Sequence, residues 1–369
     1  MTHTSLWYPL NRLLSNPSWV ALLIFFGGLG AILYFMSDWL MPVIISIILA
    51  YLLEGLIHKF ERLGVRRHFA VYVVFFTFFT LLVYSVLAVV PAIIDQGRRF
   101  IIAIPEYAQI AEDQLMRFVQ HYPSLFSQSD AQELLSSMSS EMTKFSRDLL
   151  SNRLVSSLLA MMTLLIYAIL VPLLIFFFLK DKKLILSWLG DTFLPKNRQF
   201  IQEIWTEVDI QIGNYIRGKF IEIIAIWLAC LVPFYLFGLQ YWLLLSFMVG
   251  LSVLIPYIGA TVVTVPVVLV AYAQFGLNSD FYWIVALYFI IQIIDGNILV
   301  PLIFSEAVNI HPVAIIIAVL VFGGLWGFWG IFFAIPLATL VKAIMQTWYR
   351  HEREPLAESP TDLAQSALV

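Results

Sequence analysis

The chain has 369 residues, of which 61% are hydrophobic and only 12% are charged, and its net charge is −3. A soluble chain carries about 45–50% apolar and about 25% charged residues, so this composition excludes a secreted or cytosolic enzyme and indicates a surface that faces lipid. The charge balance excludes a strongly basic nucleic-acid-binding protein, and the single cysteine, Cys230, excludes a disulfide framework.

Five apolar runs between residues 19 and 237 are predicted to be membrane-spanning helices. Each has roughly the 17–25 residues that cross about 30 Å of hydrocarbon. A backbone in lipid must satisfy its own hydrogen bonds, so the runs are predicted to be helical. The first run lacks a small-residue cleavage site and a second run follows at once, so we interpret it as a retained helix. The five spans cover 19–36, 40–57, 70–94, 155–179 and 220–237.

Basic residues set the predicted orientation, because short loops rich in Lys and Arg stay in the cytoplasm. The loop at 58–69 is such a segment, and so are residues 180–219 and the C-terminal tail. We therefore expect a multi-pass protein of a bacterial inner membrane, with both termini in the cytoplasm. Residues 95–153 then lie outside.

The polar segment 95–153 keeps the apolar spacing of amphipathic helices. One helix is predicted over 96–120, interrupted near Pro105, and another follows a serine-rich loop. The segment is either a helical hairpin that packs on itself or on the membrane face, or a subunit contact or gate. The apolar helical faces of this segment and of residues 180–219 make a homo-oligomer the expected assembly. The stripe of the second helix contains Leu134, Leu135, Met138, Met142, Phe145 and Leu149.

Residues 180–219 form a second amphipathic segment. It is predicted to lie along the cytoplasmic interface and to continue directly into the fifth span. A coupling helix is the alternative to a plain anchor. Its apolar face consists of Ile201, Ile204, Trp205, Val208, Ile212, Tyr215 and Ile216.

Two apolar segments of the C-terminal half, 241–275 and 313–344, are each interrupted by Gly and Pro. The halves of the first are short for two crossings at about 1.5 Å per residue, so a re-entrant hairpin is an alternative. Paired interrupted segments of opposite orientation point to the binding site of a secondary transporter, although Gly and Pro also allow close helix packing. The interrupting residues are Pro256 and Gly259 in the first segment and Gly323, Gly324, Gly327, Gly330 and Pro336 in the second.

Asp295 is the candidate transport residue. It lies inside the predicted span 281–300, within a stretch from 223 to 341 that contains no Lys or Arg. A carboxylate in a membrane helix is costly unless it is paired, protonated or facing a polar cavity. We interpret it as an ion-coupling residue, with a structural carboxylate bonded to a neighbouring helix as the alternative.

Three neighbours of Asp295 complete the predicted coupling site. Gln292 precedes it by three residues and shares its helix face. Asn297 offers a further amide, although it is turned aside. Gly296 permits a local break that could free backbone carbonyls for an ion.

Polar residues near the predicted cytoplasmic ends of the spans are gate candidates. Glu306, Asn309 and His311 follow the span of Asp295, and either line a wetted loop or act as a gate. Arg217, with Lys219, could pair with the membrane carboxylates or snorkel to the interface. Glu54 is expected to be exposed at the interface.

Enzyme motifs are absent from the sequence. It contains no His-Glu-x-x-His, no Gly-x-Ser-x-Gly and no Walker A pattern, and its His residues are scattered. We expect no enzyme activity, no cofactor and no metal, apart from possible coupling to protons or sodium ions.

Six blocks of sequence resemble the autoinducer-2 exporter family, and most closely its PerM-like permease branch. They occur in the expected order over nearly the whole chain. The resemblance implies a polytopic membrane protein, and family members are linked to autoinducer-2 export or to sodium/proton antiport. Asp295, Asn297, Pro301 and the Pro256–Gly259 turn fall on the family's motifs. The blocks are 174–183 (LIFFFLKDKK), 214–219 (NYIRGK), 254–259 (LIPYIG), 295–301 (DGNILVP), 305–312 (SEAVNIHP) and 323–336 (GGLWGFWGIFFAIP).

The sequence therefore predicts an all-α, polytopic transmembrane protein with about eight membrane segments, which contacts lipid and a small polar solute. The predicted function is a secondary transporter or permease that exports this solute, autoinducer-2-like by resemblance, or exchanges a cation against protons. A membrane scaffold that binds a partner through 95–153 is the alternative. The predicted parts are membrane helices over 1–94, the external insertion 95–153, a fourth span in 154–179, the cytoplasmic segment 180–219, the transport core 220–346 and a disordered tail, 347–369.

Overall fold

The computed structural model of the chain describes residues 28, 36–121, 136–137, 140–144, 146–148, 153–193, 198–256, 258–304 and 311–342. Within this part 92% of the structure is helical and no strand occurs, which confirms the all-α prediction. Six of the helices there are long and apolar enough to cross a membrane. The first predicted span, 19–36, lies almost wholly outside the described residues.

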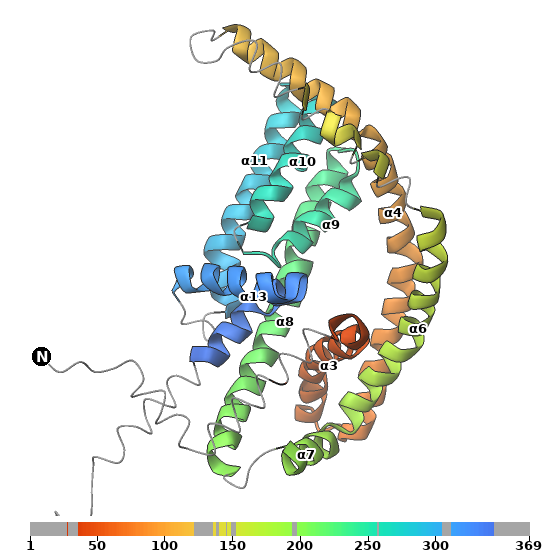
Figure 1. Ribbon diagram of the computed structural model, residues 1–369, viewed down its shortest axis with the longest axis vertical. Coiled ribbons are helices and arrows are strands. Elements are labelled where there is room, and N and C mark those ends of the chain that lie inside the picture. Colours follow the sequence, from red (N-terminus) through yellow and green to blue (C-terminus); the bar gives the residue numbers. More distant parts are fainter. Residues whose placement is uncertain are drawn as a thin grey trace, which may run out of the picture. The chain divides into compact units, whose positions relative to one another are not determined.

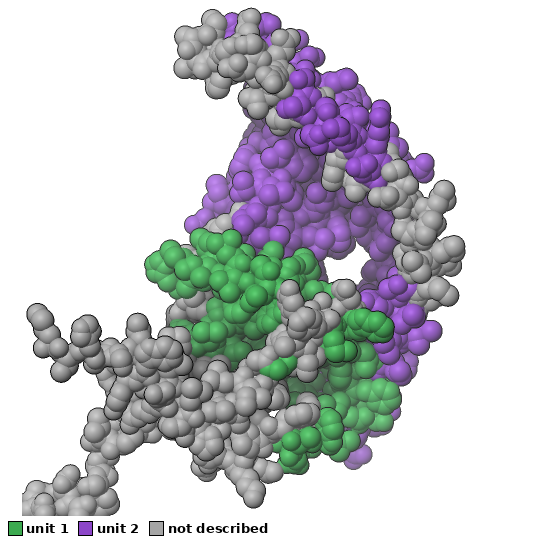
Figure 2. All heavy atoms as spheres, viewed as in Figure 1, with its two compact units in different colours: residues 1–55, 174–217, 304–369 green, residues 56–173, 218–303 purple. Residues whose placement is uncertain are grey.

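The chain divides into two compact units, each built from separate stretches of sequence (Figure 2). Unit 1 contains residues 1–55, 174–217 and 304–369, and unit 2 contains residues 56–173 and 218–303. The boundaries fall inside helices, so the chain passes between the units along continuous helical backbone.

The predicted second and third spans lie in α3 (Ser37–Arg62) and α4 (Arg67–His121) (Figure 1). The expected interruption near Pro105 is wrong, because α4 continues through both Pro91 and Pro105 for 55 residues. A proline removes one helix hydrogen bond and crowds the carbonyl four residues earlier, which a long, otherwise well-formed helix can accommodate.

Helices α6 (Arg153–Lys180), α7 (Lys182–Phe193) and α8 (Arg198–Leu236) follow. The expectation that the segment before the fifth span runs directly into it is confirmed, because α8 is one helix of 39 residues. Its first part belongs to unit 1, and residues from 218 onward belong to unit 2.

The first interrupted segment forms a helical hairpin of α9 (Trp242–Ser252) and α10 (Ile258–Phe275), whose arms lie side by side in Figure 1. Hydrogen bonds join its open ends: the Gln240 amide nitrogen donates to Gln274 Oε1 (2.7 Å), and Gln274 Nε2 donates to the Gly238 carbonyl (2.8 Å). The first and last residues of the hairpin therefore lie next to each other. At about 1.5 Å per residue, the 11 residues of α9 are too short for a crossing, whereas the 18 residues of α10 are long enough for one, so the re-entrant alternative stays a prediction.

The hairpin also packs on α4, in the segment predicted to be an external insertion. Gln96 Oε1 accepts a hydrogen bond from the Leu244 amide (3.0 Å), and the ring centroids of Phe100 and Tyr241 are 5.5 Å apart. Ser146, from the later part of the same segment, donates to the Ile101 carbonyl (2.8 Å). These contacts favour the interpretation that the segment packs on itself and on the membrane helices.

The span with Asp295 consists of α11 (Ser279–Ile294), the π-helical turn η1 (Asp295–Leu299) and α12 (Val300–Phe304). Together with α8, α9 and α10 it encloses the apolar core of unit 2, to which Tyr107 of α4 also contributes. Fully buried members of this core are Cys230, Phe234, Leu245, Val249, Val267, Val270, Ala271, Ile284 and Tyr288.

The second interrupted segment begins with α13 (Pro312–Phe332) in unit 1. The predicted break is present at Gly327, whose φ of 58° and ψ of −134° kink the helix in a conformation that favours glycine. At Gly330 the chain passes so close to the Phe322 carbonyl that a Cβ would overlap it. Residues 334–342 are helical again.

Candidate functional site

A buried ion pair lies on α8, at the start of its part in unit 2. Lys219 Nζ is 2.7 Å from Glu222 Oε2, and the two residues are only 4% and 2% exposed. They are three residues apart, so they lie on the same face of the helix. A pair this deeply buried is costly to desolvate, and good geometry with further hydrogen bonds must compensate it.

The turn between α9 and α10 supplies such a hydrogen bond. Lys219 Nζ also donates to the carbonyl of Val253 (2.8 Å), the residue that follows the end of α9. A carbonyl at a helix end has no partner inside its own helix, so it is available to a donor from elsewhere. Gly259 makes this tight turn possible, because a Cβ there would overlap the carbonyl of Ser252.

Asp295 completes the charged cluster, by which we mean Lys219, Glu222 and Asp295. It is 9% exposed, and its carboxylate interacts electrostatically with both Lys219 and Glu222. Its Oδ1 is buried and has no hydrogen-bond partner within the described part of the chain. The three described charges sum to −1, so one additional positive charge would make the cluster neutral.

The backbone at Asp295 is a π-helical turn, where the sequence predicted a local break at Gly296. The Val300 amide donates to the Asp295 carbonyl, five residues earlier. Such wide turns are rare and occur frequently at functional sites. The helix therefore stays continuous but bulges where the carboxylate projects.

A ladder of neutral polar groups lies one and two turns before Asp295, between α10 and α11. The hydroxyl oxygens of Tyr288 and Thr264 are 2.8 Å apart, and Gln292 Nε2 donates to the Tyr288 hydroxyl (3.0 Å). Thr264 in turn donates to the carbonyl of Ala260 (2.7 Å), just after the hairpin turn. The ladder ties the hairpin to the helix that carries Asp295.

Two residues predicted beside Asp295 lie apart from the charged cluster. Asn297 is exposed, and its Nδ2 donates to the carbonyl of Ile293 (2.9 Å) on its own helix. Gly296 is also exposed, with open space around it. Gln292 is the member of this group that the structure brings into a polar network. Pro256 lies in the hairpin turn itself.

The gate candidates fall in different places. Glu306 and Asn309 lie outside the described residues. His311 is exposed, and its Nδ1 accepts a hydrogen bond from the Val313 amide (3.3 Å), so it caps α13. The remaining predicted positions in unit 1 are Gly324, which is exposed in α13, Gly327 at its kink, and Pro336, which is buried.

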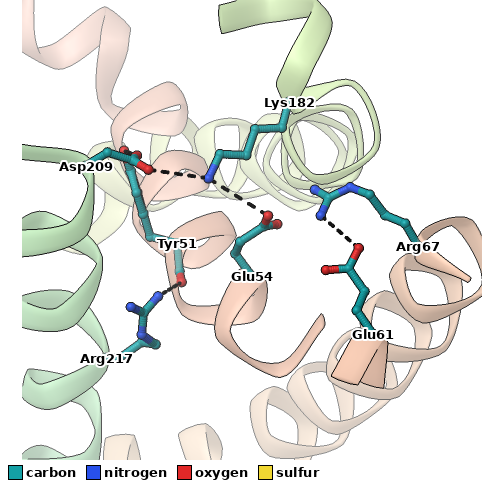
Figure 3. Close-up of polar contacts among 7 residues, drawn as sticks. All are labelled: Tyr51, Glu54, Glu61, Arg67, Lys182, Asp209 and Arg217. Carbon is teal, nitrogen blue, oxygen red and sulfur yellow. Dashed lines mark hydrogen bonds and ion pairs between the residues drawn. The ribbon is translucent and has the colours of Figure 1, made fainter. Parts of the chain in front are cut away.

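Arg217 belongs to a second polar cluster, in unit 1, formed by Tyr51, Glu54, Lys182, Asp209 and Arg217 (Figure 3). Lys182 Nζ lies between Asp209 Oδ2 (3.7 Å) and Glu54 Oε1 (3.9 Å). The Tyr51 hydroxyl donates to Asp209 Oδ1 (2.5 Å), and Arg217 Nη1 donates to the Tyr51 carbonyl (3.4 Å).

The expectation that Glu54 is exposed at the interface is wrong, because the residue is 6% exposed. Lys182 of α7 lies 3.9 Å from its carboxylate, and Arg217 of α8 interacts with it electrostatically (Figure 3). A cavity of about 250 Å³ adjoins this polar cluster. It is lined by Ile47, Ala50, Tyr51, Glu54, Phe178, Leu179, Lys182, Ile185, Leu186 and Asp209.

The polar cluster of unit 1 and the charged cluster of unit 2 differ in net charge. In unit 1 the described cations Lys182 and Arg217 balance Glu54 and Asp209. In unit 2 the charged cluster has one more carboxylate than cation, together with a carboxylate oxygen that has no partner among the described residues. The charged cluster of unit 2 is therefore the better candidate for binding a mobile ion.

Sequence reasoning missed two central residues of this site, Glu222 and Tyr288. The signal for Glu222 was its spacing from Lys219, because acid and base three residues apart at the start of an apolar run can form a pair. Tyr288 gave no separate signal, since an aromatic residue in a membrane span is usual.

Known proteins with similar sequences are named as permeases or transport proteins. A sequence profile described as "AI-2E family transporter" matches residues 21–350. The chain belongs to this family. It is 43% identical over 342 residues to a protein of Escherichia coli K12 named "Putative permease PerM", which covers 93% of this chain and 96% of that protein.

More distant relatives carry similar names. "Putative transport protein YrrI" of Bacillus subtilis is 26% identical over 320 residues, covering 85% of this chain and 87% of that protein. A "Putative transport protein" of Thermotoga maritima is 22% identical over 308 residues, covering 84% and 88%. Family membership and the apolar helices together make the chain a multi-pass membrane protein of a transport family.

Proposed function

We propose that the chain is a secondary transporter of the bacterial inner membrane. It exports a small polar solute, autoinducer-2-like by resemblance, or exchanges a cation against protons. The observation that supports the proposal most directly is the charged cluster of Lys219, Glu222 and Asp295, at the interrupted end of a hairpin between apolar helices.

The free-energy cost of placing ionisable groups among membrane helices makes this cluster informative. Ionisable side chains inside membrane helices are expensive and mark ion pathways and substrate sites. Interrupted helices provide backbone carbonyls and helix ends for substrates and ions near the middle of a transporter. The charged cluster combines both features within unit 2, since Lys219 binds the end of α9 and Asp295 projects from a π-turn.

In the proposed mechanism Asp295 is the coupling residue. A proton or cation that binds Oδ1 of Asp295 neutralises the excess negative charge of the cluster. Release of that proton or cation restores the negative charge. The polar ladder of Thr264, Tyr288 and Gln292 connects this event to the hairpin. Reloading of Asp295 is thereby linked to movement of α9 and α10.

The test is flux in proteoliposomes under an imposed pH or sodium gradient, with a panel of small polar solutes that includes autoinducer-2 and with sodium itself. Asp295→Asn is expected to abolish gradient-driven flux. Asp280→Asn is the matched control, because Asp280 is an exposed acid at the start of the same helix. Unchanged, gradient-dependent flux in Asp295→Asn contradicts the coupling role of Asp295.

A further inference from the structure

The ammonium of Lys219 occupies a position that resembles a metal-cation site. It contacts a carboxylate oxygen of Glu222 at 2.7 Å and the carbonyl oxygen of Val253 at 2.8 Å, with the Asp295 carboxylate within electrostatic reach. Carboxylates and carbonyls from interrupted helices are the ligands that small hard cations take in transporters. Here a side chain of the protein fills that position.

The charged cluster has a net charge of −1, which one further positive charge would neutralise. Among the described residues, the ionisable groups that interact electrostatically with Asp295 come from α8, namely Lys219, Glu222 and Cys230, while Tyr288 on α11 interacts with Cys230. Helices α9 and α10 contain no Asp, Glu, Lys or Arg. A single positive charge on Asp295 therefore makes the cluster neutral.

We propose that Lys219 is a built-in counter-ion that takes the place of a sodium ion, so that the site couples transport to a proton carried by Asp295. This inference rests on the proposed function and specifies its coupling ion. In the loaded state an O–H bond forms on the Asp295 carboxylate and the cluster is neutral. When that bond breaks, the proton leaves to the other side and the cluster has a charge of −1.

The proposal makes a claim about ion binding that is independent of transport. A ligand that binds only the folded state raises the thermal unfolding midpoint. The midpoint of the purified full chain in detergent is measured in NaCl, LiCl and choline chloride of equal ionic strength and pH. We expect the wild-type midpoint to be the same in all three salts.

Removing the ammonium should open the site to a metal ion. Lys219→Ala and Lys219→Gln are expected to gain a saturable stabilisation by sodium or lithium ions over choline. Lys219→Arg keeps the positive charge and should gain none. Lys144→Ala, which removes an exposed lysine paired with Glu141, is the matched control and should also gain none.

Two results overturn the proposal. One is a sodium-specific stabilisation of the wild type that Asp295→Asn abolishes. The other is a folded, monodisperse Lys219→Ala or Lys219→Gln variant that sodium does not stabilise. If neither variant folds, the wild-type measurement decides alone. A transporter that moves no solute counts against the proposed function, whereas sodium binding by the wild type counts against this inference.

Discussion

The hydroxyl oxygen of Tyr288 on α11 lies 2.8 Å from Oγ1 of Thr264 on α10, inside the core of unit 2. The same hydroxyl accepts a hydrogen bond from Gln292, one turn before Asp295. One phenol thus joins the returning arm of the hairpin to the helix of the candidate coupling residue. Movement of either element requires these bonds to rearrange.

Tyr288→Phe removes this junction while keeping the ring. We expect a loss of about 1–3 kcal/mol in the free energy of unfolding, because buried polar partners lose their hydrogen bonds. Flux should fall as well, since Asp295 and the hairpin become uncoupled. The measurements are thermal unfolding in detergent and flux in proteoliposomes.

The control for this variant is Tyr282→Phe, an exposed tyrosine on the same helix. It should change neither stability nor flux. Equal behaviour of the two variants contradicts the role of the Tyr288 hydroxyl.

Gly259→Ala tests the closed end of the hairpin. A Cβ at 259 overlaps the carbonyl of Ser252, so the turn must open and the end of α9 must shift. We expect destabilisation of about 1–3 kcal/mol, as for other overpacked sites. Since Lys219 binds the Val253 carbonyl beside this turn, flux should also decrease.

Gly324→Ala is the matched substitution, because nothing lies within 4 Å of a Cβ at that position. Its unfolding midpoint is expected to equal or exceed that of the wild type, since alanine favours a helix over glycine. A Gly259→Ala variant as stable as Gly324→Ala would show that the turn tolerates a side chain.

Much of the membrane architecture followed from simple physical rules. A long apolar run must be helical in lipid, and this rule placed the helices that carry residues 40–57, 70–94 and 220–237. The interruptions at Pro256 and Gly327 were also visible, because glycine and proline mark backbone that departs from a regular helix.

Other features depend on tertiary contacts that no local pattern reveals. Pro105 looked like an interruption, but α4 continues through it. Glu54 looked exposed at the interface, yet the structure buries it beside Lys182, which lies far away in the sequence. Asp295 was identifiable because a lone acid in an apolar run is costly, whereas Glu222 was overlooked because its partner makes it less conspicuous.

Glu54→Gln tests the unit 1 polar cluster. It removes the charge that lies 3.9 Å from Lys182 Nζ, in a side chain that is 8% exposed. We expect a loss of about 1–3 kcal/mol in the free energy of unfolding, because a charged partner inside the protein is lost. Glu61→Gln is the control, since Glu61 pairs with Arg67 at 3.4 Å in a more exposed position. A larger effect at Glu61 contradicts the structural importance of the polar cluster.

The pair of Lys219 and Glu222 allows a sharp test of burial. Lys219→Met leaves the carboxylates of Glu222 and Asp295 without a cation, and it is expected to lower the free energy of unfolding by about 3–5 kcal/mol. Glu222→Gln removes the carboxylate in contact with the ammonium but leaves Asp295 to balance its charge, so its effect should be smaller. The double variant removes both charges, so it should be more stable than the sum of the single effects predicts.

The chain supplies its own reference for this cycle in Lys144 and Glu141. They are also three residues apart at 2.7 Å, but their side chains are 66% and 71% exposed. Water and salt screen such a pair, so Lys144→Met and Glu141→Gln should have little effect. Thermal unfolding of both sets of single and double variants gives the two coupling energies. Equal coupling in the two pairs would contradict the buried, dry environment that makes the charged cluster a candidate ion site.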